Sequence, residues 1–199
     1  MNNYFLLSGK NTSRLASAFA PEGTKLAHEL IQDLDDFNEL PFDLELYVLS
    51  DGQTGLVKSK ELNSLHVIWL DYQPNSLAWP LVSEKMKTLI NNHLTGNETI
   101  DWINAKIIGN DEIRKYYIPR FQKKLDVLDM QKTMFVQDTD KIIRPCFSLS
   151  KISNLNIFHL PSSYNLWKIT PSIYISEILK KAMQKEKLTG IDFEKTMVA

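Results

Sequence analysis

The sequence has few of the residues that mark several specialised classes of protein. Its single cysteine, Cys146, can form neither an intramolecular disulfide nor a cysteine cluster for structural zinc, which favours a reducing compartment. Seven glycines and eight prolines in 199 residues exclude a collagen-like or linker-dominated chain. No apolar run approaches the roughly 18 residues of a membrane span, and the N-terminus lacks the basic start of a secretory signal. We therefore expect a soluble, cytoplasmic, globular protein that does not engage a membrane.

Motifs for catalysis and for metal binding are also missing. The chain has no glycine-rich phosphate loop and no nucleophile elbow, and Cys146 lies in an apolar run that is typical of a buried, inert thiol. Four histidines are scattered without paired metal-ligand spacing: His28, His66, His93 and His159. We therefore expect no catalytic residue, no cofactor, no metal site and no enzymatic activity. A cleft that gathered these histidines with carboxylates would revive an enzymatic interpretation.

Acidity in the first half of the chain is the clearest excess. Residues 1–100 carry 7 Lys and Arg against 13 Asp and Glu, whereas residues 101–199 carry 16 against 11. No Lys or Arg lies between Lys25 and Lys58, and that stretch holds eight carboxylates: Glu29, Asp33, Asp35, Asp36, Glu39, Asp43, Glu45 and Asp51. Such a run keeps a surface hydrated, or it steers a basic partner by its charge. The spacing lacks the glycine and the regular oxygen ligands of a calcium loop.

Hydrophobic periodicity predicts an α+β fold with an antiparallel, β-rich core and a few capped helices. Apolar spacing predicts helices over 24–38, from Ser83 to Gly96, and over 176–187. Short apolar runs predict strands at 4–7, 44–49, 156–160, 172–175 and 191–194. Between Thr99 and Lys151, runs of apolar and β-branched residues alternate with polar ones, which predicts an antiparallel meander.

A weak internal repeat relates two of the predicted helices. Residues 81–86 (Leu-Val-Ser-Glu-Lys-Met) and 174–179 (Tyr-Ile-Ser-Glu-Ile-Leu) share the order strand end, Ser, Glu, helix, and both helices are followed by Leu-Thr-Gly. The serine hydroxyl suits an N-cap, and glycine suits a left-handed C′ position. The spacing from Ser to Gly differs by one residue, so the pattern fits either a strand-helix-strand duplication or two helices with similar caps.

One segment imitates a nucleic-acid-binding surface. Residues 114–124 hold five cations and three aromatic residues, which could neutralise phosphates and stack on bases. The same pattern fits a strand with basic ends whose rings face the core, and a pI near 6.4 lies well below the values typical of dedicated nucleic-acid-binding domains. We expect no nucleic-acid partner, and we keep a nucleic-acid-associated regulatory protein as the alternative function.

A set of ordered segments is similar to immunity protein family eleven of bacterial polymorphic toxin systems. The segments are residues 81–86, Tyr116-Tyr117 leading into 125–129, and 173–177 with 188–193. They extend over about residues 66–195. The resemblance implies a non-enzymatic, cytoplasmic inhibitor that is encoded beside a toxin and neutralises it by binding. We expect residues 66–199 to form the α+β domain of this family and residues 1–65 to add an acidic, partner-specific segment, within one continuous globular unit.

Such an inhibitor needs fast association and slow release rather than a catalytic site. The acidic stretch is therefore our candidate for the toxin-facing surface, with Phe37 or Tyr47 as aromatic anchors if their rings are exposed. The predicted partner-binding residues are Asp33, Asp35, Asp36, Phe37, Glu39, Asp43, Glu45 and Tyr47.

Overall fold

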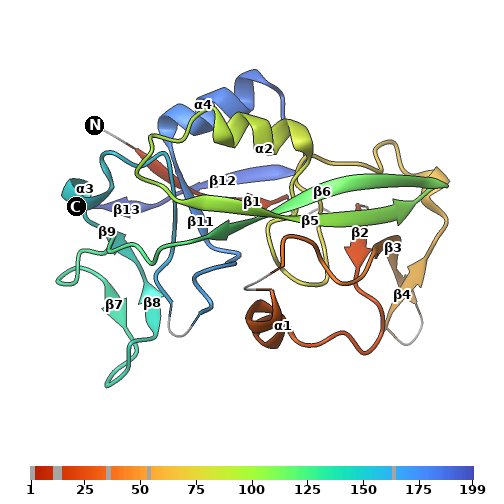
Figure 1. Ribbon diagram of the computed structural model, residues 1–199, viewed down its shortest axis with the longest axis horizontal. Coiled ribbons are helices and arrows are strands. Elements are labelled where there is room, and N and C mark those ends of the chain that lie inside the picture. The colour runs from red at the N-terminus through yellow and green to blue at the C-terminus, as the bar shows by residue number, and fades with distance from the viewer. Residues whose placement is uncertain (1–2, 11–14, 35–36, 53–54, 163–164) are drawn as a thin grey trace.

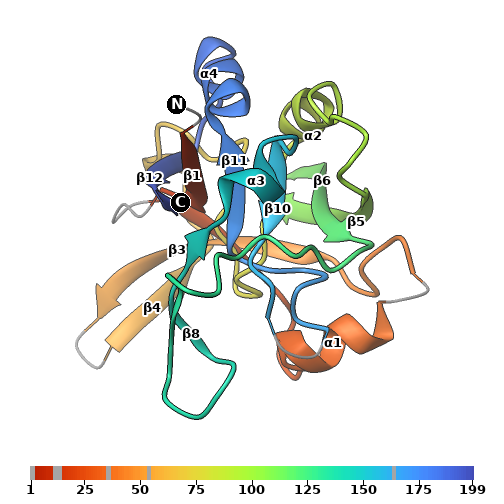
Figure 2. The same ribbon diagram turned by 90° about the vertical axis from the view of Figure 1, so that its left-hand side faces the viewer.

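The computed structural model describes residues 3–10, 15–34, 37–52, 55–162 and 165–199. Strand is more than twice as abundant as helix, at 36% against 16%, which confirms the predicted α+β class. Two larger sheets form the middle of the molecule, α2 and α4 lie together on one side, and α1 lies on the opposite side (Figures 1 and 2). No helix in the described part of the chain has the length and apolar character needed to cross a membrane.

The elements follow one another with short helices between groups of strands. The strands are β1 (Tyr4–Gly9), β2 (Ala16–Phe19), β3 (Leu44–Gly52), β4 (Gly55–Ser59), β5 (Ile100–Gly109), β6 (Glu112–Phe121), β7 (Met134–Phe135), β8 (Ile142–Arg144), β9 (Cys146–Phe147), β10 (Ile157–His159), β11 (Ile173–Ser176), β12 (Ile191–Lys195) and β13 (Met197–Val198). The helices are α1 (Ala27–Asp33), the 3-10 turn η1 (Leu62–Ser64), α2 (Glu84–Asn91), α3 (Leu149–Ile152) and α4 (Glu177–Lys185).

The first sheet is antiparallel throughout and has the order β10-β11-β1-β12. Its strand β1 comes from the start of the chain but lies between two strands from its end. Phe5 is opposite Ile175 of β11 on one side and opposite Lys195 of β12 on the other. The sheet therefore depends on a strand that lies more than 160 residues away from both of its neighbours.

The second sheet has the order β2-β3-β5-β6, with β4 also paired to β3. β5 and β6 form a long antiparallel hairpin, whereas β3 runs parallel to β5 and pairs with it only at Leu44 and Glu45. Strands from the first 65 residues thus take part in both large sheets.

Strand β6 separates two hydrophobic cores because its side chains alternate between faces. Tyr116 and Ile118 pack in the core that also holds the buried face of α1. Tyr117 and Phe121 pack in the core beneath α2 and α4. A third core on the other side of β1 and β11 is built around a cluster of aromatic rings: Tyr4, Phe147, Phe158 and Tyr174.

Two sequence predictions need correction. The meander expected between Thr99 and Lys151 is wrong, because β5–β6 and β7–β8 are hairpins in different sheets and segment 125–128 contributes only a bridge from Leu128 to Phe147. The helix predicted over 24–38 is shorter: α1 ends at Asp33. Side chains from β6 take the carbonyl groups beyond its end, as described below, so the helix does not continue.

The predicted caps of α2 and α4 are confirmed. The hydroxyl oxygen of Ser83 accepts from the Met86 N–H at 3.2 Å, and that of Ser176 accepts from the Leu179 N–H at 3.3 Å. α4 has nine residues and α2 has eight, which accounts for the one-residue difference in the repeat.

The glycine prediction is half right. Gly96 and Gly190 do adopt positive φ, at 89° and 77°. They do not occupy C′, because each lies four residues beyond its C-cap. Gly190 is also held by space, since an added Cβ would lie 2.4 Å from the Tyr72 carbonyl oxygen.

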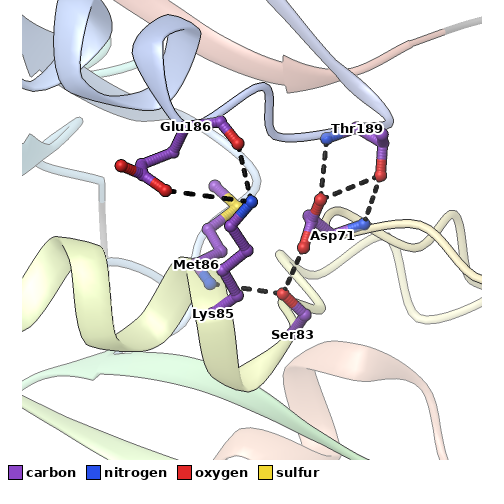
Figure 3. Close-up of polar contacts among 6 residues, drawn as sticks. All are labelled: Asp71, Ser83, Lys85, Met86, Glu186 and Thr189. Carbon is purple, nitrogen blue, oxygen red and sulfur yellow. Dashed lines mark hydrogen bonds and ion pairs between the residues drawn. The ribbon is translucent and has the colours of Figure 1, made fainter.

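Asp71 ties the start of α2 to the loop that follows α4 (Figure 3). One of its carboxylate oxygens accepts from the Ser83 hydroxyl at 2.7 Å. The other accepts from the Thr189 N–H at 2.8 Å and from its hydroxyl at 2.9 Å. Lys85 of α2 adds a hydrogen bond to the Glu186 carbonyl oxygen at 2.6 Å. We call the contacts of Asp71, Ser83 and Thr189 the Asp71 network.

An equivalent set of contacts ties the start of α4 to the loop that follows α2. The Ser176 hydroxyl donates to the Asn156 side chain at 2.5 Å, and the Asn156 amide donates to the His93 carbonyl at 2.8 Å. The buried Glu98 carboxylate accepts from the backbone N–H of Asn156 at 2.5 Å and of Thr95 at 2.8 Å. We call the contacts of Glu98, Asn156, Ser176 and Thr95 the Glu98 network.

Strand order supports the internal repeat as well. Tyr72, Val82 and Tyr117 pair in the order 72-82-117 and are followed by β5, just as β10, β11 and β1 are followed by β12. Lys87 lies 3.7 Å from the ring centre of Tyr117, and Lys180, at the matching position of α4, lies 3.6 Å from that of Phe5. We infer that the two strand-helix-strand units are related by a duplication.

Candidate functional site

The predicted acidic surface begins on α1 and continues through segment 37–43 into β3. Segment 38–40 runs beside β5, because the Asn104 N–H donates to the Asn38 carbonyl at 2.7 Å and the Leu40 N–H donates to the Asn104 carbonyl at 2.9 Å. This pairing encloses an open groove of about 660 Å³, which we call the α1 groove. Its lining includes Asp33, Phe37, Glu39, Phe42, Asp43 and Lys106.

Arg120 of β6 positions the segment that forms one wall of this groove. Its side chain is only 7% exposed and forms an ion pair with Asp101 at 2.6 Å. Its guanidinium group also donates to the carbonyl oxygens of Leu34 and Phe37, and to the Asn38 side chain at 3.0 Å. A guanidinium presents five N–H donors in a fixed planar fork, so one residue can hold several acceptors of a turn. These contacts explain why the chain leaves the helix after Asp33.

The carboxylates around the groove are partly balanced by lysines. Asp33 lies 2.6 Å from the ammonium of Lys25, and Glu39 lies 2.8 Å from that of Lys106. The hydrogen bond from Lys106 holds the pKa of Glu39 below its ordinary value. All four side chains are about half exposed, so each pair contributes at most about 1 kcal/mol to stability.

Glu45 and Tyr47 are brought together in a separate cluster on β3. The Tyr47 hydroxyl donates to Glu45 at 2.5 Å, and Lys60 forms an ion pair with Glu45 at 2.9 Å. The hydrogen bond from Tyr47, followed by that from Lys60, lowers the pKa of Glu45. The ring of Tyr47 packs edge-on against Phe19. Neither residue lines the α1 groove.

The two candidate aromatic anchors differ in exposure. The side chain of Phe37 is 61% exposed at the groove, whereas Tyr47 is half-buried. Two further predicted residues, Asp35 and Asp36, lie outside the described residues. Sequence reasoning missed Phe42, Lys106 and Arg120. Phe42 is marked only by its place in the acidic stretch, and the other two are far away in the chain.

The basic and aromatic segment 114–124 does not offer its rings for stacking. Tyr116, Tyr117 and Phe121 are all buried, and the Tyr116 hydroxyl donates to the Leu70 carbonyl at 2.8 Å. Arg120 is buried and paired as described above. The interpretation of this segment as a strand with basic ends is therefore the one that the structure supports, and nucleic-acid binding is not favoured.

The histidines do not gather with carboxylates at a cleft. His159 is fully buried against Phe121 and Trp167, and burial lowers its pKa, which keeps the ring neutral. His28 borders a second hollow of about 590 Å³, and the described lining of that hollow contains no carboxylate. Among the described residues, no group of three or more His, Cys, Asp and Glu side chains is arranged to hold a metal ion.

Residues 53–198, most of the chain, match the model of the Immunity protein family (Imm11). No curated protein matches the sequence. The match includes both helix networks, Lys106 and Arg120, whereas segment 33–43 of the α1 groove precedes it.

Proposed function

Because the chain belongs to the Immunity protein family (Imm11), we propose that it binds a cognate bacterial toxin and neutralises it by protein–protein contact. In this proposal the protein catalyses no reaction, acts in the cytoplasm of the cell that makes it and is encoded beside its toxin. The family match is the single observation that carries the proposal.

We propose further that the acidic surface from Asp33 to Tyr47 contributes to the toxin interface. Two features of the described residues support this location. Phe37 exposes most of a large apolar ring beside an open groove, and exposed aromatic rings are frequent anchors of protein interfaces. The surrounding carboxylates would attract a basic partner and raise its association rate at low salt.

The physical requirements of inhibition fit such a surface. An inhibitor must capture its toxin quickly and release it slowly, so charge steering and a packed contact have separate roles. A stable interface buries about 1,600 Å² in total, which is larger than the groove alone. The groove is therefore proposed as the centre of a wider contact, and the Glu45–Tyr47 cluster on β3 belongs to its surroundings.

The first experiment asks whether the chain confers immunity. Cells that express the toxin encoded beside the gene are compared with and without this protein, and the purified pair is tested for a stable complex. Survival together with a complex supports the proposal. Equal killing in both strains would overturn it, as would turnover of a metabolite by the purified protein.

The second experiment tests the location of the interface. Glu39→Lys combined with Asp43→Lys should slow association with the toxin about tenfold at low salt and reduce its salt dependence. Asp192→Lys combined with Glu194→Lys changes the net charge equally on exposed positions of β12, in the other large sheet. An unchanged rate in the first variant, or equal slowing in both, would remove the acidic surface from the interface.

A further inference from the structure

The α1 groove combines apolar walls with carboxylates at its rim. Leu34 and Leu40 line it from the core, where they are 1% and 6% exposed. Phe37 and Phe42 add two aromatic rings. A groove of this composition offers contact both to an apolar surface and to a positive charge.

The charges within the groove are not balanced. Three carboxylates line it, and two of them are matched by the ammonium groups of Lys25 and Lys106. The third, Asp43, is exposed, and within the described part of the chain its carboxylate takes part in no ion pair or hydrogen bond. One negative charge therefore remains beside two aromatic rings, which is complementary to a single cation.

We propose that the α1 groove binds an arginine side chain of the partner, an inference that rests on the proposed function. The guanidinium group is planar and weakly hydrated, so it stacks on an aromatic ring while its edge donates to a carboxylate. Here the ring is that of Phe37 or Phe42 and the carboxylate is that of Asp43. A lysine ammonium is compact and strongly hydrated, and it gains less from the same pair of contacts.

The groove also has the size for this occupant and its neighbours. Ligand sites in proteins commonly occupy about 300 to 1,000 Å³, and the α1 groove has about 660 Å³. That volume admits one arginine side chain together with part of the flanking backbone. Arg120 keeps the wall in place before binding, because it holds the carbonyl groups of Leu34 and Phe37. Such preorganisation lowers the entropy cost of binding.

A first test uses small probes and needs no toxin. The full chain, labelled with ¹⁵N, is titrated with N-acetyl-arginine amide and separately with N-acetyl-lysine amide. We expect the arginine probe to shift the amide signals of residues 37–43 and Lys106 in a saturable manner, with a dissociation constant at least about threefold lower than that of the lysine probe. Equal binding of both probes, or shifts spread over the whole surface, would overturn the inference.

Variants then locate the contact. Phe37→Ser and Asp43→Asn should each weaken binding of the arginine probe several-fold, because one removes the ring and the other removes the charge. Asp192→Asn on β12 is the matched control for charge and should leave binding unchanged. The one-dimensional amide spectrum of each variant reports whether the fold is retained. Unchanged binding in both groove variants would contradict the proposal.

A third test separates this inference from the proposed function. Arginines of the toxin are replaced one at a time by lysine, and each variant is paired with the wild-type protein and with Phe37→Ser. We expect one arginine whose replacement weakens binding about tenfold with the wild-type protein and much less with Phe37→Ser, which shows that the two residues act together. If the toxin is neutralised and no arginine shows this dependence, the inference fails and the proposed function stands. If the protein confers no immunity, the proposed function fails whatever the probes show.

Discussion

The Asp71 network and the Glu98 network differ in how many side chains they use and in how deeply the charge lies. Asp71 is half-buried, and its two carboxylate oxygens serve the Ser83 cap and Thr189 at once. Asn156 occupies the matching place beside Ser176, but its side chain has only one oxygen and its amide donates to the His93 carbonyl. Thr95 is therefore held by a separate acid, Glu98, which is 5% exposed.

This difference shows how a repeated arrangement of backbone can be kept while its side chains change. An amide in place of a carboxylate loses an acceptor, so a second residue must supply it. The replacement acceptor is buried, where an unsatisfied N–H group is costly. The two helices should therefore depend unequally on their acids, although they depend equally on their serines.

Removal of Glu98 should have the largest effect. Glu98→Ala leaves the N–H groups of Thr95 and Asn156 without their acceptor in a buried place, which should lower the free energy of unfolding by about 2–4 kcal/mol. Urea denaturation followed by circular dichroism measures the loss. Glu98→Gln keeps one acceptor oxygen and should lose clearly less. A loss below about 1 kcal/mol for Glu98→Ala would show that water replaces the carboxylate.

Removal of Asp71 should cost less, because the site is half-buried and water can reach it. We expect Asp71→Ala to lower the free energy of unfolding by about 1–2 kcal/mol. Asp71→Asn sharpens the comparison, since it places at position 71 the residue found at 156. It should keep the Ser83 contact and lose part of the Thr189 contact, with an intermediate loss in the same denaturation experiment. A loss for Asp71→Ala that exceeds that for Glu98→Ala would reverse the proposed order.

The two N-cap serines should contribute about equally. Ser83→Ala and Ser176→Ala each remove one acceptor from a helix N-terminus, and each should cost about 1 kcal/mol. Thermal unfolding of both single variants and of the double variant measures this. Glycine at either position is the control, because it is tolerated at N-caps and should cost only a few tenths of a kcal/mol. Strongly unequal losses would argue against equivalence of the two units.

The paired lysines should give the smallest effect. Lys87→Met and Lys180→Met keep the apolar stem and remove the charge above Tyr117 and Phe5, which should cost about 0.5 kcal/mol each. Lys181→Met on α4 removes a lysine that pairs only with Glu177 and serves as the control. Equal values for all three variants would remove the ring contacts from the list of features that the two units share.

The sequence predicted what depends on near neighbours. The Ser caps, the left-handed glycines and the hairpin β5–β6 each follow from a few adjacent residues, and these predictions hold. Features that require distant partners were missed. The end of α1 depends on Arg120, more than 80 residues away, so periodicity alone extended the helix to Phe37 and Asn38.

The candidate site shows the same limit. The acidic stretch and Phe37 could be named from the sequence because they lie within fifteen residues of one another. Lys106 could not, because only the pairing of segment 38–40 with β5 brings it beside Glu39. Tyr47 and Glu45 are close to the groove residues in sequence, but the extended backbone of β3 carries them into another cluster.

The position of β1 has a consequence for the order of events during synthesis. The ribosome makes residues 4–9 first, yet both neighbours of that strand emerge only after residue 172. Until then the nascent strand has two open edges, which are prone to wrong pairing. Closure of this sheet joins the two ends of the polypeptide across a long loop, a slow type of step. Protection by a newly made molecule would therefore begin only after translation is nearly complete.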